Sequence, residues 1–410
     1  MILFFLTSGL FLGWSLGAND ASNVFGSAVG SRMISFRKAA IISSIAVIFG
    51  AVIQGSGASQ TLGDLGAVNA LGGSFTVALA AAVTVFAMTR FSLPVSTTQA
   101  VVGAIIGWNF FTGNKTDSAT LIKIVSTWVT GPVIGALFAI ILFRMISLLK
   151  KKSNIHLIKF ESRIRTGLLL AGAFGAYSLG ANNIANVMGV FVPAFNLQEL
   201  DLGFFSLSSN QQLFLFGGIA IAAGIISYSK RVMQTVGANI MQLSAEAALV
   251  VVLAHSLVLF IFSSSSLSAM FTKAGLPAIP MVPVSSTQVI LGCIIGIGLY
   301  RGVHNINFRL AGEIALGWII TPVISGVISF FSLFFVKNIF SINVGNKVPD
   351  NIASDNIQII ADENISLIFR HLLSGVIIIL IVAFILYILL ENKKAREMKK
   401  SEEKFWHSIK

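Results

Sequence analysis

A ten-residue polar stretch that occurs twice limits what this chain can fold into more than any other feature. Residues 15–24 read SLGANDASNV and residues 178–187 read SLGANNIANV, so seven of the ten positions are identical. Each copy places amide side chains inside an otherwise apolar run, and the first copy adds the carboxylate of Asp20. Inside a membrane, lipid would offer these groups no hydrogen-bond partner. Other polar groups must therefore meet both copies.

Two further stretches recur in the same order. LPVSTTQ at residues 93–99 returns as VPVSSTQ at 282–288, and WVTGPV at 128–133 returns as WIITPV at 318–323. Chance similarity between apolar segments does not reproduce polar heptapeptides. We infer that one ancestral unit was used twice, and that the chain has two structurally related halves.

Composition places the chain in a membrane. Hydrophobic residues make up 55% of the sequence and charged residues only 11%, far from the balance of soluble domains. The net charge of +12 comes mainly from basic residues around 144–165 and after Glu391. Basic residues beside spans orient a membrane protein, so nucleic acid is not expected as a partner. The lone Cys293 excludes an internal disulfide and a cysteine metal site.

Apolar runs predict the transmembrane segments, which need about 20 helical residues each. The candidates are 2–30, 35–56, 75–90, 97–111, 119–148, 166–192, 212–229, 236–262, 287–300, 310–336 and 367–391. Short pieces interrupted by Gly or Pro at matching places in two halves indicate re-entrant helices. We therefore expect helical hairpins near 75–111 and 236–300.

The predicted fold is an all-α polytopic membrane protein with two inverted-topology repeats, re-entrant helical hairpins and one extra C-terminal transmembrane helix. Basic residues on one side of this layout predict an external N-terminus and a cytoplasmic C-terminus. The predicted parts are the first repeat at 1–148, a basic cytoplasmic linker at 149–165, the second repeat at 166–336, an external polar loop at 337–366, the final helix at 367–391 and a basic cytoplasmic tail at 392–410.

The PVSTTQ stretch and its twin have the pattern of a helix start. Pro restricts the chain, Ser or Thr can cap, and an apolar helix follows. A helix N-terminus buried in the membrane can bind an oxyanion through its free N–H groups and its dipole. The alternative is that each cluster is an ordinary cap. The predicted anion-contacting residues are Ser96, Thr97, Thr98, Gln99, Ser285, Ser286, Thr287 and Gln288.

The first duplicated stretch supplies oxygens of the kind that a monovalent cation prefers. We expect carboxylate and amide oxygens to act with backbone carbonyls freed by an unwound helix, as in transporter sodium sites. The alternative is that the amides join helices by hydrogen bonds. The predicted sodium-contacting residues are Asn19, Asp20, Asn23, Asn182, Asn183 and Asn186, with Glu246 either a further cation ligand or the partner of a basic residue.

The GANDASN stretch at 17–23, followed by GSAVG at 26–30, resembles the signature of the inorganic phosphate transporter (PiT) family, and PVSTT at 94–98 resembles its hairpin motif. The resemblance covers about residues 10–336. It implies a cation-coupled phosphate carrier with two inverted repeats, assembled as a homodimer, with the coupling ion in place of a cofactor. Enzymatic activity is not expected, because the spans contain no His/Cys cluster for a metal and no nucleophile–base pair. By position, it assigns the Ser/Thr clusters to phosphate and the Asp/Asn cluster to cation or phosphate contacts.

Many members of that family have His where this chain has Gln99 and Gln288. Without an imidazole there, a proton relay at those positions is unavailable, which favours sodium as the coupling ion. The predicted function is sodium-coupled symport of inorganic phosphate across the plasma (inner) membrane by alternating access. The alternatives are a permease for sulfate or another oxyanion, a proton-coupled phosphate symporter, and an anion channel.

Overall fold

The computed structural model describes residues 2–66, 68–90, 95–152, 157–195, 197–201, 206–233, 243–302, 308–345 and 375. The predicted final helix at 367–391, apart from Gly375, and the tail at 392–410 lie outside these residues, as does most of the predicted loop at 337–366. Internal contacts divide the chain into two units, one of 1–196 and 209–359 and the other of 197–208 and 360–410.

The described part of the smaller unit contains a short antiparallel β-hairpin. Strand β1 (Leu200–Asp201) pairs with β2 (Ser206–Leu207), with Leu200 opposite Leu207. No strand was predicted from the sequence. They are two residues long each and leave the all-helical class of the protein unchanged.

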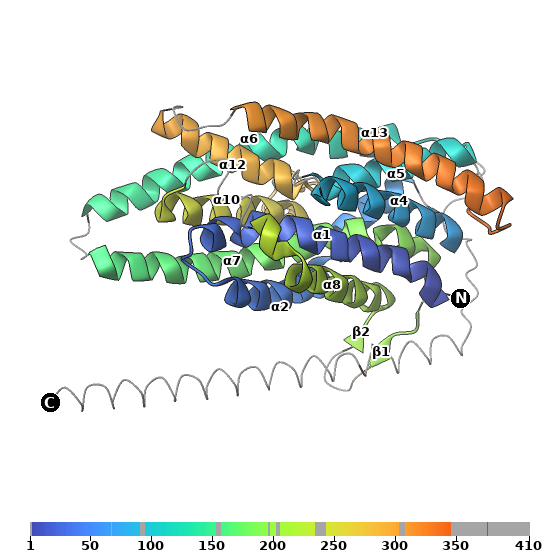
Figure 1. Cartoon of the computed structure of the whole chain (residues 1–410), viewed down its shortest axis with the longest axis horizontal. Helices are drawn as coiled ribbons and strands as arrows, with labels where there is room; N and C mark the ends of the chain where they lie inside the picture. Colours follow the sequence, from blue (N-terminus) through green and yellow to red (C-terminus); the bar gives the residue numbers. More distant parts are fainter. Residues whose placement is uncertain are drawn as a thin grey trace. The chain divides into compact units, whose positions relative to one another are not determined.

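The larger unit is built of helices, drawn in sequence colours in Figure 1. In the first half these are α1 (Ile2–Gly30), α2 (Phe36–Gln54), α3 (Ser56–Leu65), α4 (Leu71–Arg90), α5 (Thr97–Thr112) and α6 (Ser118–Lys152). In the second half they are α7 (Leu157–Met188), the 3-10 helix η1 (Gly189–Ala194), α8 (Ser209–Ser227), α10 (Ala245–Ser263), α11 (Ser265–Lys273), α12 (Ser286–Arg301) and α13 (Phe308–Asn338).

Several helices can cross a membrane. Among the described residues, six are long and apolar enough by length and composition: α2, α4, α6, α8, α10 and α13. Helices α5 and α12 have 16 residues each, so they extend about 24 Å and fall short of a typical crossing. They are the second arms of the two predicted hairpins, whose first arms are α4 and α10. The protein is a multi-pass membrane protein.

Equivalent helices of the two halves make equivalent contacts. Helix α1 packs against α4 as α7 packs against α10. The second arm of each hairpin packs against the last helix of the other half: α5 lies against α13, and α12 lies against α6. This exchange of partners is consistent with the predicted doubled architecture.

Glycine makes the closest of these exchanged contacts possible. A Cβ atom on Gly103 of α5 would lie 2.0 Å from the carbonyl oxygen of Pro322 on α13. A Cβ atom on its twin, Gly292 of α12, would lie 2.2 Å from the carbonyl oxygen of Pro132 on α6. Any side chain at either position would force the backbones apart, so the hairpin arms sit against the opposite half by backbone contact.

The outer helices carry apolar side chains on an exposed face. On α6 these include Ile122, Val129, Leu137 and Leu148, and on α13 they include Ile319, Val323, Val327 and Phe331. Lipid tails solvate such faces as well as a protein core does, so exposure there is not costly. Helices α6 and α13 occupy equivalent positions in the two halves, so their exposed apolar faces are also consistent with a repeated architecture.

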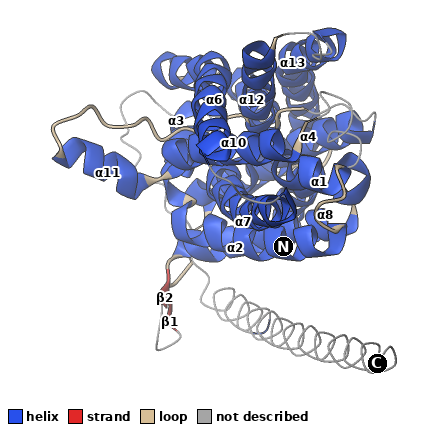
Figure 2. Ribbon diagram, turned by 90° about the vertical axis from the view of Figure 1, so that its left-hand side faces the viewer, coloured by secondary structure: helices blue, strands red, loops and turns tan. Residues whose placement is uncertain are grey.

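Three local features differ from the sequence-based expectations. Helices α6 and α7 extend into the predicted linker at 149–165 and leave only residues 153–156 between them. Helix α3 (Ser56–Leu65) lies between the predicted segments 35–56 and 75–90, where no helix was predicted. The second hairpin carries an additional helix, α11, which has no buried residue and stands to one side in Figure 2.

Candidate functional site

The two hairpin helices begin with the same local structure. Ser96 caps α5, since its Oγ accepts a hydrogen bond from the backbone N–H of Gln99 at 3.3 Å. Ser285 caps α12 by accepting from the N–H of Gln288 at 3.4 Å. Each hydroxyl therefore satisfies one backbone amide in the first turn of its own helix, while the other amides of that turn have no intrahelical acceptor. Both caps are buried.

The residue before each cap anchors the hairpin to the long helix of the same half. The carbonyl oxygen of Val95 accepts from Asn19 Nδ2 at 3.1 Å. Asn182 binds Val284 twice: its Nδ2 donates to the Val284 carbonyl at 2.8 Å, and its Oδ1 accepts from the Val284 N–H at 2.8 Å. Asn19 and Asn182 are twins, so each polar stretch holds the start of its own hairpin helix.

The last asparagine of each stretch reaches the hairpin of the other half. Asn23 Nδ2 donates to Ser286 Oγ at 2.9 Å and lies 3.4 Å from Thr287 Oγ1. Its twin, Asn186, donates to Thr98 Oγ1 at 2.9 Å. These contacts bring both polar stretches and both hairpin starts into one cluster.

The two hairpin helices also touch each other directly. Thr287 Oγ1, in the first turn of α12, donates to the Val95 carbonyl at 2.9 Å. The N-termini of α5 and α12 therefore converge, and the positive ends of their dipoles meet in one buried region. The duplicated Ser/Thr clusters, predicted from sequence to act together, lie together.

Asp20 contributes the formal negative charge of the cluster. Its side chain is 2% exposed. Asn19 Nδ2 donates to Oδ1 at 2.7 Å, and Asn183 Nδ2 donates to Oδ2 at 3.3 Å. No ion pair to Asp20 is found within the described ranges, so its charge is met only by neutral amides. A buried carboxylate without a cationic partner is costly, and a bound cation would offset that cost.

Asn183 links the amides of the second stretch. Its Oδ1 accepts from Asn182 Nδ2 at 3.2 Å and from Asn186 Nδ2 at 3.0 Å. Helices α1 and α7 run continuously through both stretches, so neither is unwound there, contrary to the expectation for the cation site. The backbone carbonyls available to the cluster come instead from the residues that precede α5 and α12.

Several polar atoms of the cluster are buried without a protein partner. They are Thr97 Oγ1, Gln99 Oε1, Gln288 Oε1, Asn186 Oδ1 and His255 Nδ1. Buried polar atoms are nearly always hydrogen-bonded, so orphaned ones call for a partner such as a water molecule or a bound ion. The cluster thus combines a free hydroxyl donor, suited to an anion, with free carbonyl oxygens, suited to a cation.

His255 is a member of the cluster that the sequence analysis omitted. It lies on α10, is fully buried, and its Nε2 is 2.9 Å from Ser286 Oγ. Positions 99 and 288 carry no imidazole, but His255 brings one to the cluster from the first arm of the second hairpin. A lone ionisable ring within a 19-residue apolar helix was the available signal.

Glu246 stands apart from the cluster. It forms an ion pair with Lys150 at the end of α6, and their side chains are 19% and 47% exposed. Glu246 lies in the first turn of α10, about 13 Å along the helix axis from His255 at ~1.5 Å per residue. The structure therefore gives Glu246 a basic partner, the second of its two predicted roles.

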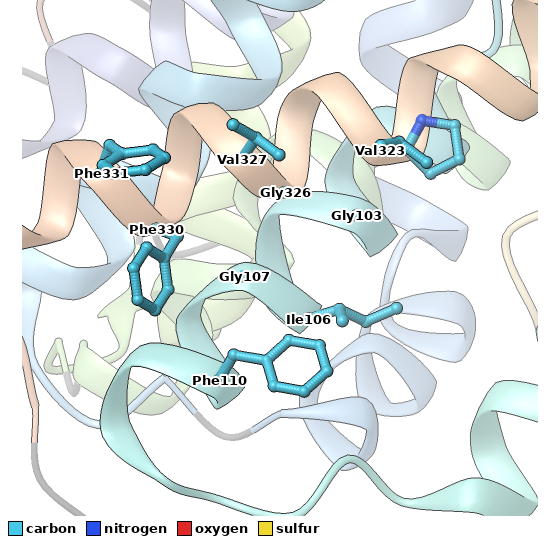
Figure 3. Close-up of a pocket in the computed structure, with 10 residues that line it drawn as sticks. Gly103, Ile106, Gly107, Phe110, Val323, Gly326, Val327, Phe330 and Phe331 are labelled. Atoms are coloured by element: carbon cyan, nitrogen blue, oxygen red, sulfur yellow. The ribbon is translucent and has the colours of Figure 1, made fainter.

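Among the described residues, two cavities are lined by none of the side chains of the cluster. The larger, about 580 Å³, is a groove between α5 and α13 that only apolar residues and glycines line, including Ile106, Phe110 and Phe331 (Figure 3). It offers an oxyanion no hydrogen-bond donor from a side chain. A second cavity of about 400 Å³ has charged side chains, Asp64 and Lys123, in its lining, together with Val282, three residues before the cap of α12.

Comparisons with known proteins show the family of the chain. The pattern that defines the phosphate transporter family matches residues 16–329. A candidate phosphate permease of Pyrococcus furiosus is 24% identical over 80% of this chain and 94% of its own length. One from Methanocaldococcus jannaschii is 27% identical over 79% of this chain and 94% of its own length.

The fold also matches a solved structure. A protein described as the sodium-dependent phosphate transporter superposes with a TM-score of 0.64 at 23% identity, covering 82% of this chain and 98% of that one. The likeness in fold and the family match together cover both polar stretches and both hairpins. The chain belongs to the phosphate transporter family.

Proposed function

We propose that this protein is a sodium-coupled symporter of inorganic phosphate. The observation that carries the proposal is the convergence of two capped helix N-termini, from both halves of the chain, on a buried cluster that holds a carboxylate without a cationic partner. An oxyanion and a monovalent cation are complementary to these two features. The family membership supports phosphate as the anion.

Phosphate is assigned to the region between α5 and α12. Each helix N-terminus carries roughly half a positive charge together with unpaired N–H groups. Hydroxyls from both hairpins lie there, and Thr97 Oγ1 has no protein partner. Two such ends can bind an oxyanion without a buried Arg or Lys. The residues that we assign to phosphate are Ser96, Thr97, Thr98, Gln99, Ser285, Ser286, Thr287 and Gln288.

Sodium is assigned to the adjoining amide and carboxylate oxygens. Asp20 supplies the formal charge, and the orphaned Asn186 Oδ1 is the kind of ligand that a hard cation takes. Asn19, Asn23, Asn182 and Asn183 complete the assigned set. Sodium next to the anion offsets negative charge in a region of low dielectric, so each ion raises the affinity for the other. This mutual dependence would be the basis of coupling.

Alternating access is the proposed cycle. The exchanged packing of hairpin arms and last helices gives two related halves that can rock about the shared site.

We further propose a plasma (inner) membrane location with the N-terminus outside and the C-terminus in the cytoplasm, from the distribution of basic residues. A homodimer surrounded by lipid is part of this proposal and rests on the family resemblance. No catalytic step or organic cofactor enters the cycle.

The test is uptake of radiolabelled phosphate into proteoliposomes. An inward sodium gradient is compared with an equal choline gradient, with protein-free liposomes as the control. We expect accumulation above the external concentration only with sodium. A parallel sample with excess unlabelled sulfate is expected to retain that uptake.

Each other outcome has a definite meaning. Equal uptake in choline contradicts sodium coupling, and a proton ionophore then separates proton coupling from a channel. A channel would equilibrate phosphate but would not concentrate it. Loss of uptake in excess sulfate would replace phosphate with sulfate as the favoured substrate.

A further inference from the structure

The hydrogen bonds around Ser286 restrict where its proton can point. Thr287 Oγ1 lies 2.9 Å from the Val95 carbonyl, which can only accept, so the Thr287 hydroxyl donates there. The same Thr287 oxygen also faces Asn23 at 3.4 Å. It can only accept from Asn23, because its proton is already used. This orients the Asn23 amide with its NH₂ group towards α12.

Ser286 Oγ therefore accepts a hydrogen bond from Asn23 Nδ2 at 2.9 Å. Its second contact is His255 Nε2, also at 2.9 Å. A neutral imidazole carries its proton on one of its two nitrogens, so two arrangements are available. Either Nε2 accepts the Ser286 proton, or an Nε2–H donates to the remaining lone pair of Ser286.

The two arrangements have opposite consequences for an anion. If Nε2 accepts the Ser286 proton, the hydroxyl can offer a ligand only a lone pair, which repels a negative oxygen. If Nε2–H donates, Asn23 and His255 fill both lone pairs of Ser286, and its proton must go to an acceptor outside this trio. Only the second arrangement makes Ser286 a donor to an oxyanion.

We propose that His255 is a positioning residue: as the Nε2–H tautomer, it directs the Ser286 hydroxyl as a hydrogen-bond donor to bound phosphate. The inference rests on the proposed function, since phosphate is the acceptor that it names. Helices α10 and α12 are the two arms of one hairpin and pack together. His255 and Ser286 thus stay together if that hairpin moves as a body.

The contact between His255 and Ser286 lies within the second half of the protein. The twin of Ser286 is Thr97, whose Oγ1 is buried without a protein partner. The first repeat, residues 1–148, contains no histidine. The hydroxyl on α5 is free to turn either way, whereas that on α12 is held in one direction. Thr97 therefore provides an internal control for the role of His255.

The first test is transport kinetics in proteoliposomes. His255→Leu removes the donor, and we expect the KM for phosphate to rise about tenfold, a typical effect of one charge-assisted hydrogen bond, with little change in maximal rate. His255→Gln retains an N–H donor and is expected to bring KM back to within about threefold of the wild type. Variants are compared only after size-exclusion chromatography shows a single folded species.

A double-variant comparison separates positioning from general packing. In a Ser286→Ala background, His255→Leu should raise KM no further, because the hydroxyl that it orients is gone. In a Thr97→Ala background, the full increase should remain. An unchanged KM in His255→Leu alone, or an equal further increase in the Ser286→Ala background, overturns the inference while leaving the proposed function intact.

The second test does not depend on transport. ¹⁵N-histidine NMR of the wild-type protein, with the His255 signals assigned by their loss in His255→Gln, reports which nitrogen carries the proton. The Nε2–H tautomer is expected, and the Nδ1–H tautomer overturns the proposal. If the wild-type protein takes up no phosphate, the proposed function is contradicted, and phosphate is no longer the acceptor of the Ser286 hydrogen bond. The tautomer of His255 still decides the direction of the Ser286 hydroxyl in that case.

Discussion

Asp20 and Asn183 occupy the same position in the two polar stretches, 163 residues apart, and their side chains meet: Asn183 Nδ2 donates to Asp20 Oδ2 at 3.3 Å. The two halves of the chain thus touch at equivalent residues, one charged and one neutral. The negative charge of Asp20 therefore lies at the junction between the two polar stretches. A symmetric pair of carboxylates there would repel each other at short range.

The charge at this junction predicts the effect of removing it. Asp20→Asn should abolish sodium-dependent accumulation of phosphate, because no carboxylate remains to favour a cation over water. The new amide has a single carbonyl oxygen, so it can replace one of the two acceptors that Asp20 offers to Asn19 and Asn183, while its NH₂ group faces the other donor. Size-exclusion chromatography therefore checks that the variant is folded before uptake is compared. Uptake at graded sodium concentrations measures this, and undiminished sodium activation would remove Asp20 from the mechanism.

Moving the charge to the other half provides a sharper test. Asn183→Asp alone should impair transport, because two buried carboxylates would then lie in contact. Combined with Asp20→Asn, it restores a single carboxylate at the junction, and we expect part of the sodium dependence to return. Sodium-driven uptake of both single variants and the double variant gives the comparison. A double variant no better than Asp20→Asn would show that the position of the charge matters, and not its presence alone.

The contact between α5 and α13 predicts a large loss of stability from a small substitution. Gly103→Ala would place a methyl group 2.0 Å from the Pro322 carbonyl oxygen. Relieving that overlap requires a backbone shift, which costs about 1–3 kcal/mol. Thermal unfolding in detergent should show a lower midpoint. Gly63→Ala is the control, because nothing lies within 4 Å of its added Cβ and its midpoint should be unchanged or higher.

A buried tryptophan ties α5 to the segment after α13. Trp108 is 1% exposed, and its Nε1–H donates to the Val344 carbonyl at 2.8 Å. Trp108→Phe would leave that carbonyl unpaired and should lower the free energy of unfolding by about 1–3 kcal/mol. Trp14→Phe is the matched control, since the Trp14 Nε1–H bonds to Ser227 at an exposed site. Equal midpoints for the two variants in thermal unfolding would contradict this account.

The sequence alone predicted the features that depend on local interactions. Composition and run length identify a membrane protein, because lipid requires long apolar helices whatever the fold. The Pro-Val-Ser stretches predicted the starts of α5 and α12, since a cap acts within one turn of its own residue. Duplication predicted two related halves, each with a polar stretch and a hairpin, and the equivalent helix contacts of the structure are consistent with that prediction.

Only the tertiary structure decided which polar groups meet. Asn23 contacts Ser286 across 263 positions of the chain, and Asn186 contacts Thr98 across 88, in each case reaching the other half. The structure also places His255 in the cluster and pairs Glu246 with Lys150. Helices α1 and α7 remain regular α-helices at their asparagines. No local pattern encodes these outcomes, because they depend on how separate helices pack. Capping residues determine where α5 and α12 begin, whereas the close fit between glycine-containing helices determines which side chains face one another.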